Sequence, residues 1–242
     1  MGVRDDLIAG VRAEARRSFV LRALLAVWVP LGGVAIAVDC EMRAVVAGLI
    51  RRLATLDQAG VADHHIEMLS MFTMWVLIVT IVSWLAWQSR AQANLRLVGC
   101  AHTKFGPLQA AAAWFVPIWQ LVAPSRAMRE LWIRSNMKNA TRAIDEDGEP
   151  IPVLVWWIVL LMSRLGDVIG RAIIGRQPTL ASLHRGAITS LVTHCLVTIA
   201  AVAAIVVVTR IHRMQAALTA ADAAPAILED EAADPEPAPE QS

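Results

Sequence analysis

The chain has 242 residues, of which 57% are hydrophobic and only 18% are charged. A soluble domain has about 45–50% apolar and about 25% charged residues, so this composition excludes an ordinary soluble globular protein and a disordered chain. The formal net charge is +1, but the seven acids from Asp222 onward have no bases among them. The rest of the chain carries 22 bases against 14 acids, a net charge of +8, which suits anionic lipid headgroups. Nucleic acid is not an expected partner, because the bases are scattered and form no dense patch.

Four apolar stretches predict an all-α polytopic membrane helix bundle, with a membrane domain over residues 19–215. The stretches cover residues 19–38, 69–89, 151–170 and 187–209. Each is close to the ~20 residues that a helix needs to cross the hydrocarbon core of a bilayer. A cleavable signal peptide is the alternative for the first stretch, but the long segment before it carries acids, which is unusual for such peptides.

The polar segments complete the predicted organisation. Residues 1–18 are expected to form an amphipathic helix on the membrane surface, or a basic flank of the first span. Residues 39–69 are expected to form a polar connection with a short helix near Met42–Leu56. Residues 216–242 are acidic and rich in Ala and Pro, which predicts a disordered tail. The Ala-rich stretch 215–224 is also able to extend the last helix.

Catalytic and metal-binding patterns are weak or missing. Asp63, His64, His65 and Glu67 include possible metal ligands, but no further well-spaced ligand pair supports them, so a solvated loop is the favoured interpretation. No common nucleophile, zinc-protease, phosphate-binding or dinucleotide-binding motif occurs. We therefore expect no enzyme, no metal and no cofactor, and we assign no catalytic residue.

Residues 107–124 are apolar but too short and too broken for a simple span. Pro117 interrupts them, and proline removes a helix hydrogen bond and kinks the chain. The segment could span, enter and return, or lie at the interface. Four spans would place fourteen Lys and Arg on the side of both termini and six on the other, whereas five spans would give about ten on each side. The positive-inside rule favours four spans with a half-inserted 107–124 and both termini in the cytoplasm.

A polar and aromatic stripe leaves the second span. Trp84, Trp87, Arg90 and Asn94 follow one another at spacings of 3, 3 and 4, so they share one helical face. The stripe could anchor the helix at the membrane interface. Alternatively, it could be the packing face for the segment that follows.

Three ionisable residues fall within the last two spans. Arg164 and Asp167 are separated by three residues, and an opposite-charge pair is the usual way to tolerate such groups near a bilayer. His194 shares a helical face with Ser190 and Thr198, and we expect that face to point at other helices.

The block from Trp84 to Ser135 resembles domain of unknown function 4328, a family of bacterial multi-pass membrane proteins, and the resemblance extends over residues ~70–215. The residues that carry it are Trp87, Arg90, Asn94, Trp114, Phe115, Pro117, Pro124, Glu130 and Trp132. The resemblance implies a helical membrane fold in a bacterial cell membrane, and it implies no activity.

The favoured function is a non-catalytic membrane scaffold or binding protein that docks lipid or a protein partner. A headgroup pocket of Arg90, Asn94, Arg126 and Arg129 is its sharpest form. The alternative is a small transporter or channel-like component that acts as a homo-oligomer, for which Arg164, Asp167 and His194 would be the polar intramembrane groups.

Overall fold

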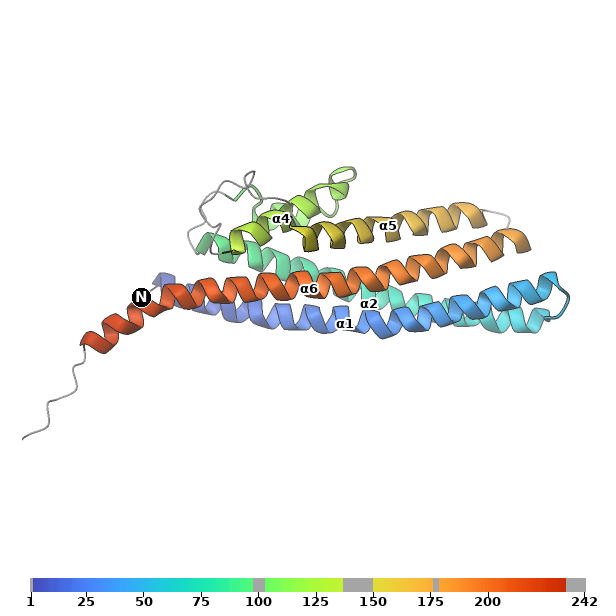
Figure 1. Cartoon of the computed structure of the whole chain (residues 1–242), viewed down its shortest axis with the longest axis horizontal. Coiled ribbons are helices and arrows are strands. Elements are labelled where there is room, and N and C mark those ends of the chain that lie inside the picture. Colours follow the sequence, from blue (N-terminus) through green and yellow to red (C-terminus); the bar gives the residue numbers. More distant parts are fainter. Residues whose placement is uncertain (1, 98–102, 137–149, 176–178, 234–242) are drawn as a thin grey trace, which may run out of the picture.

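Helices make up every regular element that the computed structural model describes, which covers residues 2–97, 103–136, 150–175 and 179–233 (Figure 1). In chain order they are α1 (Gly2–Ile50), α2 (Leu56–Leu97), α3 (Pro107–Ala112), the 3-10 turn η1 (Trp119–Leu121), α4 (Ala123–Ser135), α5 (Ile151–Ile174) and α6 (Leu180–Ala233). Helices α1, α2, α5 and α6 are long and apolar enough to cross a membrane. The all-α bundle with four spans is therefore confirmed.

The first two long helices are more continuous than the sequence predicts. Helix α1 runs through the predicted boundary at residue 18 and on to Ile50, and α2 begins at Leu56. Residues 2–18 therefore continue into the first long helix, which agrees with the alternative of a basic flank, whereas the polar connection at 39–69 is wrong because residues 39–50 and 56–69 are helical. Arg52, at φ 59°, is in the left-handed region and reverses the chain.

A capping box starts α2 directly after this turn. The Gln58 N–H donates to Thr55 Oγ1 at 3.3 Å, and the Thr55 N–H donates to Gln58 Oε1 at 3.0 Å. The possible metal ligands at 63–67 consequently lie on helix α2 and not in a loop. His65 Nδ1 lies 3.0 Å from Glu41 Oε2 on α1.

Helix α6 also continues further than expected, to Ala233. The Ala-rich stretch 215–224 explains much of this extension, because alanine has the highest helix propensity. The predicted disordered tail thus differs from the structure over 216–233, and its remainder, 234–242, lies outside the described residues.

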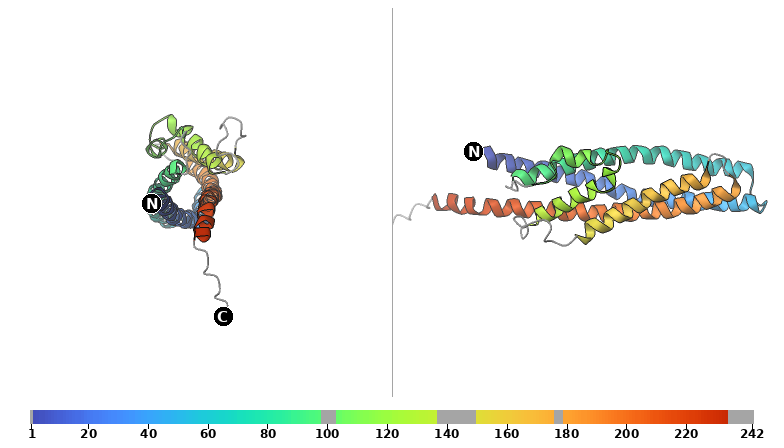
Figure 2. Two further views of the ribbon diagram at one scale, coloured as in Figure 1. Left: turned by 90° about the vertical axis from the view of Figure 1, so that its left-hand side faces the viewer. Right: turned by 90° about the horizontal axis from the view of Figure 1, so that it is seen from above.

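The long helices form a curved layer in the order α2, α1, α6, α5, since α1 packs on α2 and α6 and α6 packs on α5. The start of α1 and the end of α6 lie at one end of the bundle, which we call the terminal end (Figures 1 and 2). The end of α1, the start of α2, the end of α5 and the start of α6 lie at the opposite end, which we call the far end. Helices α3 and α4 cover the terminal half of the layer and contact α2, α5 and α6.

Small residues allow α6 to approach its neighbours closely. A Cβ at Gly32 on α1 would lie 2.0 Å from Thr198 Oγ1, and a Cβ at Gly166 on α5 would lie 2.3 Å from Thr193 Oγ1. Gly170, one turn beyond Gly166, faces Thr189. Small residues four apart are a common device for close helix packing in membranes.

We expect Gly32→Ala to lower the thermal unfolding temperature in detergent, because overpacking a helix contact costs about 1–3 kcal/mol. Gly33→Ala is the matched control, since a Cβ at Gly33 would meet nothing within 4 Å. The control should leave stability unchanged or raise it by up to about 1 kcal/mol through helix propensity. Equal effects of the two changes would contradict a close contact between α1 and α6 at this level.

Candidate functional site

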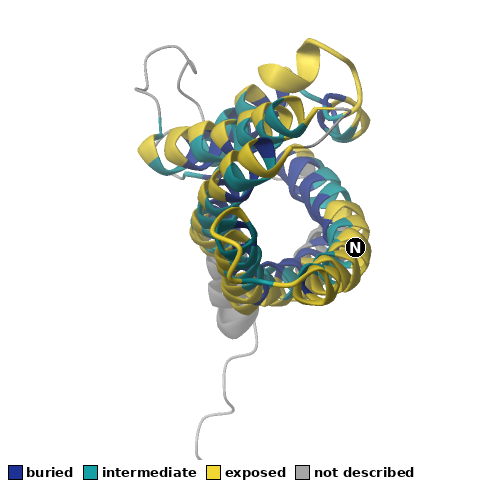
Figure 3. Cartoon of the chain, turned by 90° about the vertical axis from the view of Figure 1, so that its right-hand side faces the viewer, coloured by how far each residue is buried: buried dark blue, intermediate teal, exposed yellow. Residues whose placement is uncertain are grey.

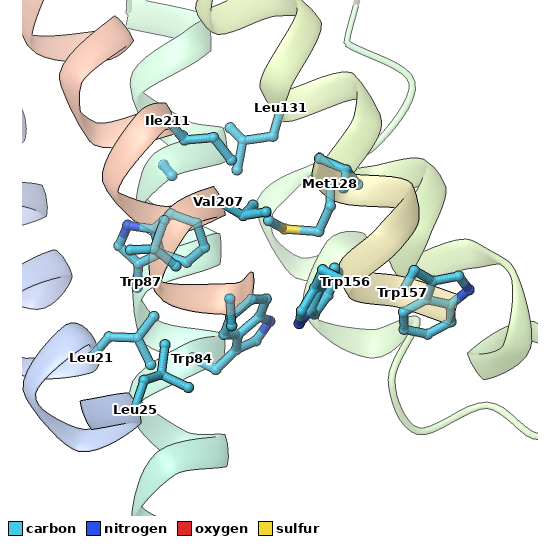
Figure 4. Packing of buried hydrophobic residues seen from close by; sticks show 14 of the residues in the cluster. Leu21, Leu25, Trp84, Trp87, Met128, Leu131, Trp156, Trp157, Val207 and Ile211 are labelled. Atoms are coloured by element: carbon cyan, nitrogen blue, oxygen red, sulfur yellow. The ribbon is translucent and has the colours of Figure 1, made fainter. Parts of the chain in front are cut away.

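Tryptophan side chains gather where α2, α5 and the segment after α3 meet. Trp84 stacks on Trp156 with ring centroids 5.1 Å apart, and Trp114 lies 5.9 Å from Trp157. Trp87 contacts Trp84 edge to face at 5.5 Å. Figure 4 shows four of these rings between the aliphatic side chains of α1, α4 and α6. The aromatic cluster therefore joins the bundle to the segment that follows α2.

The indole N–H groups of Trp84, Trp87, Trp114 and Trp157 donate to protein acceptors. Trp84 and Trp114 both donate to Oε1 of the buried Gln88, at 3.1 and 2.9 Å. Trp157 donates to the Leu121 carbonyl at 3.3 Å. Buried polar groups without a partner are costly, so each bond fixes the segment it reaches.

A buried carboxylate links three helices beside the cluster. Glu14 on α1 is 1% exposed and accepts a hydrogen bond from the Trp87 indole at 2.9 Å. Its second oxygen lies 2.7 Å from His212 Nδ1 on α6. Arg90 donates to the Gly10 carbonyl at 3.4 Å in the same layer. Helices α1, α2 and α6 thus share one polar contact at the terminal end.

Residues 107–124 form a folded-back segment and not a spanning helix. Helix α3 ends at Ala112, the chain turns with Ile118 at φ 67°, and α4 begins at Ala123. Pro117 cannot continue a helix, whereas Pro124 fits the first turn of α4, where its missing N–H costs nothing. We call residues 107–135 the hairpin.

Two polar side chains hold the base of the hairpin. Glu130 on α4 is 3% exposed and accepts hydrogen bonds from the backbone N–H groups of Lys104 at 2.5 Å and Phe105 at 3.0 Å. Gln92 on α2 donates to the Ala127 carbonyl at 3.2 Å. The hairpin is therefore tied both to its own entry and to α2.

The tip of the hairpin exposes large apolar side chains. Ile118 is 80% exposed and Phe115 66% exposed. The other exposed apolar residues of the hairpin are Leu108, Val116, Trp119, Leu121 and Val122. Seen from the far end, the turn of the hairpin stands out as exposed beside the long helices (Figure 3). A contiguous apolar patch of this kind marks a contact with a membrane or a partner.

Cations are the second feature of the terminal end. The exposed ones are Arg12, Arg16, Arg17, Arg96, Lys104, Arg126, Arg210 and Arg213. Both acids whose side chains are described at this end, Glu14 and Glu130, are buried. Exposed acids lie instead at the far end, at Asp57, Asp63 and Glu67. The accessible surface of the terminal end is thus positively charged in its described part.

The residues of the predicted motif are used in different ways. Trp87 and Arg90 donate hydrogen bonds to groups of α1, whereas Trp84 of the same stripe contacts Trp114 of the hairpin. Asn94 is 2% exposed, and neither of its amide atoms has a hydrogen-bond partner. It is therefore not accessible to a lipid headgroup, and the pocket predicted around it does not form at the surface. Trp132 packs against the core cluster.

Sequence reasoning missed the polar side chains that carry the site, namely Glu14, Gln88, Gln92 and His212. Two signals could have found them. Gln88 and Gln92 are four apart at the end of an apolar run, so they share a helix face. Glu14 is the only acid between Asp6 and Asp39.

The polar groups predicted within the spans do not form one site. Arg164 and Asp167 form the expected pair on α5 at 3.9 Å, with side chains 56% and 38% exposed. His194 Nδ1 instead lies 2.6 Å from Oδ2 of Asp39 on α1, whose side chain is 8% exposed. No three His, Cys, Asp or Glu side chains within the described ranges could hold a metal ion together.

These features define a multi-pass membrane protein whose terminal end carries a basic, apolar-tipped hairpin. A family model described as Domain of unknown function (DUF4328) matches residues 51–213, and the chain belongs to this family. Helix α1, which supplies Glu14, lies before the matched residues. Comparisons with curated proteins and with solved structures gave no match.

The two buried amides of α2 provide a test of the site. Gln88→Leu should lower stability by about 2 kcal/mol, because two indole N–H groups lose their acceptor. Asn94→Leu, the matched control, should leave stability unchanged or raise it, because the Asn94 amide has no partner to lose. Thermal unfolding followed by tryptophan fluorescence measures both. A stability loss in Asn94→Leu as large as in Gln88→Leu would contradict this assignment of the hydrogen bonds.

Proposed function

We propose that the protein is a non-catalytic membrane scaffold whose terminal end binds anionic lipid at the cytoplasmic leaflet. One observation carries the proposal: exposed cations and an exposed apolar hairpin tip occur together, while the acids described there are buried. Cations near a charged leaflet are attracted to it by about 1 kcal/mol each. The apolar tip adds burial in the acyl region.

The hairpin contacts support a half-inserted position. The Leu121 carbonyl accepts from Trp157, which lies two turns after the start of α5 at Ile151. Two helical turns correspond to a depth of about 10 Å. If α5 enters the bilayer near its first turn, the tip lies below the headgroups, and the basic base of the hairpin lies among them.

The charge distribution supports the orientation. With the terminal end in the cytoplasm, the exposed arginines of α1, α4 and α6 satisfy the positive-inside rule. Both termini are then cytoplasmic, and in a bacterium the membrane is the cytoplasmic one.

The contacts favour binding over catalysis or transport. Glu14, Gln88 and Glu130 are each bonded to protein groups that hold helices together. Asp39 and His194 pair across α1 and α6, apart from the Arg164–Asp167 pair on α5. A transport path would require polar groups to be shared along the bundle, so the transporter alternative has less support. A protein partner or homo-oligomer is the other occupant that the exposed apolar surface would suit.

The test compares unfolding temperatures with added phosphatidylglycerol and with added phosphatidylcholine. Phosphatidylglycerol should stabilise the wild-type chain more, because it is anionic. The triple variant Arg126→Gln, Arg210→Gln and Arg213→Gln should reduce this difference, because it removes three of the exposed cations of the terminal end. The matched triple Arg43→Gln, Arg51→Gln and Arg52→Gln, at the far end, should retain the full difference between the two lipids. Equal stabilisation of the wild type by both lipids would contradict the proposal.

A further inference from the structure

A groove lies between α1 and α2 on the outside of the terminal half. It has a volume of about 160 Å³ and is lined by Arg16, Arg17 and Val20 on α1 and by Ser83 on α2. Both arginines are exposed, and Val20 is 49% exposed. The hydrogen bonds between α2 and the hairpin involve Gln88 and Gln92, and neither residue lines the groove.

We propose that this groove binds one anionic phospholipid, with the phosphate on Arg16 and Arg17 and an acyl chain along α1 and α2. The inference rests on the proposed function and gives it a defined site outside the hairpin. Phosphate is the expected headgroup because a guanidinium presents several N–H donors in a plane that matches phosphate oxygens.

A hydrogen bond positions Arg17, and no acid described beside the groove neutralises the charge of either arginine. Arg17 donates to the Ala86 carbonyl at 3.0 Å, which holds its side chain across the groove toward α2. The guanidinium has five N–H donors, so most remain available to an anion. The nearest acid in the sequence, Glu14, is buried against Trp87 and His212. The groove therefore presents two positive charges to a negatively charged ligand.

The position along the helix suits a lipid more than a soluble phosphate. Arg16 and Arg17 lie just before the apolar run of α1, which begins at Phe19, and Val20 lies about one turn after Arg17. Exposed apolar side chains continue on the same helical faces, at Val27 seven residues after Val20 and at Val79 four residues before Ser83. A headgroup at the arginines would thus have apolar helix surface beneath it for an acyl chain.

Native mass spectrometry of the full chain tests this site, with phosphatidylglycerol titrated against phosphatidylcholine. The wild type should retain one phosphatidylglycerol at low lipid concentration. Arg16→Gln with Arg17→Gln should weaken its binding about 30-fold, at about 1 kcal/mol for each charge. Ser83→Leu should also weaken it by filling the groove while both charges remain. The control Arg43→Gln with Arg51→Gln removes two exposed cations at the opposite end of the bundle and should retain the lipid.

The outcomes separate the site from the broader function. If the wild type prefers phosphatidylglycerol and the arginine variant still retains it, the groove is not the site, but the lipid-binding function stands. Retention by Ser83→Leu alone would also overturn the groove, because the arginines would then act only as surface charge. Displacement of the lipid by equimolar glycerol 3-phosphate would overturn a lipid ligand. No preference in the wild type would overturn both proposals.

Discussion

The buried carboxylate of Glu14 is the contact on which the terminal end depends. A charge of this kind is tolerated in a core only when its oxygens are well bonded, and Glu14 meets Trp87 on α2 and His212 on α6. Both bonds form only when α1, α2 and α6 are in one register. The exposed pair of Glu41 and His65 at the far end imposes no such constraint, because water can replace either partner.

The fixed register positions the surfaces that we assign to lipid. It places Gln88 where two indoles reach it, and the aromatic cluster then seats the hairpin against α2 and α5. The carboxylates of Glu14 and Glu130 accept hydrogen bonds inside the protein, so they do not neutralise the exposed cations of the terminal end. The same contacts that stabilise this end therefore leave its described surface positively charged.

The spans and the broken hairpin follow from hydropathy and proline, which are local properties of the sequence. Pro117 interrupts 107–124 and Pro124 suits the first turn of α4, so a broken segment could be predicted there, although Pro30 is accommodated within α1. The continuity of α1 could not, because no proline or glycine signal separates a surface helix from a span. The contacts of Glu14 and Gln88 depend on residues far apart in the chain, such as His212 and Trp114, and a single sequence does not reveal which helices adjoin. The Trp87 stripe was therefore predictable as a packing face, but its partner was not.

The depth of the hairpin tip tests the central claim most directly. A single cysteine would replace Ile118 in a chain with Cys40, Cys100 and Cys195 changed to serine, and the protein would be placed in lipid nanodiscs that expose both membrane faces. A charged, membrane-impermeant maleimide should label Ile118→Cys much more slowly than Arg126→Cys, which lies at the exposed base of the hairpin. Adding detergent should remove the difference. Equal labelling rates in the intact bilayer would place the tip in water and contradict the account.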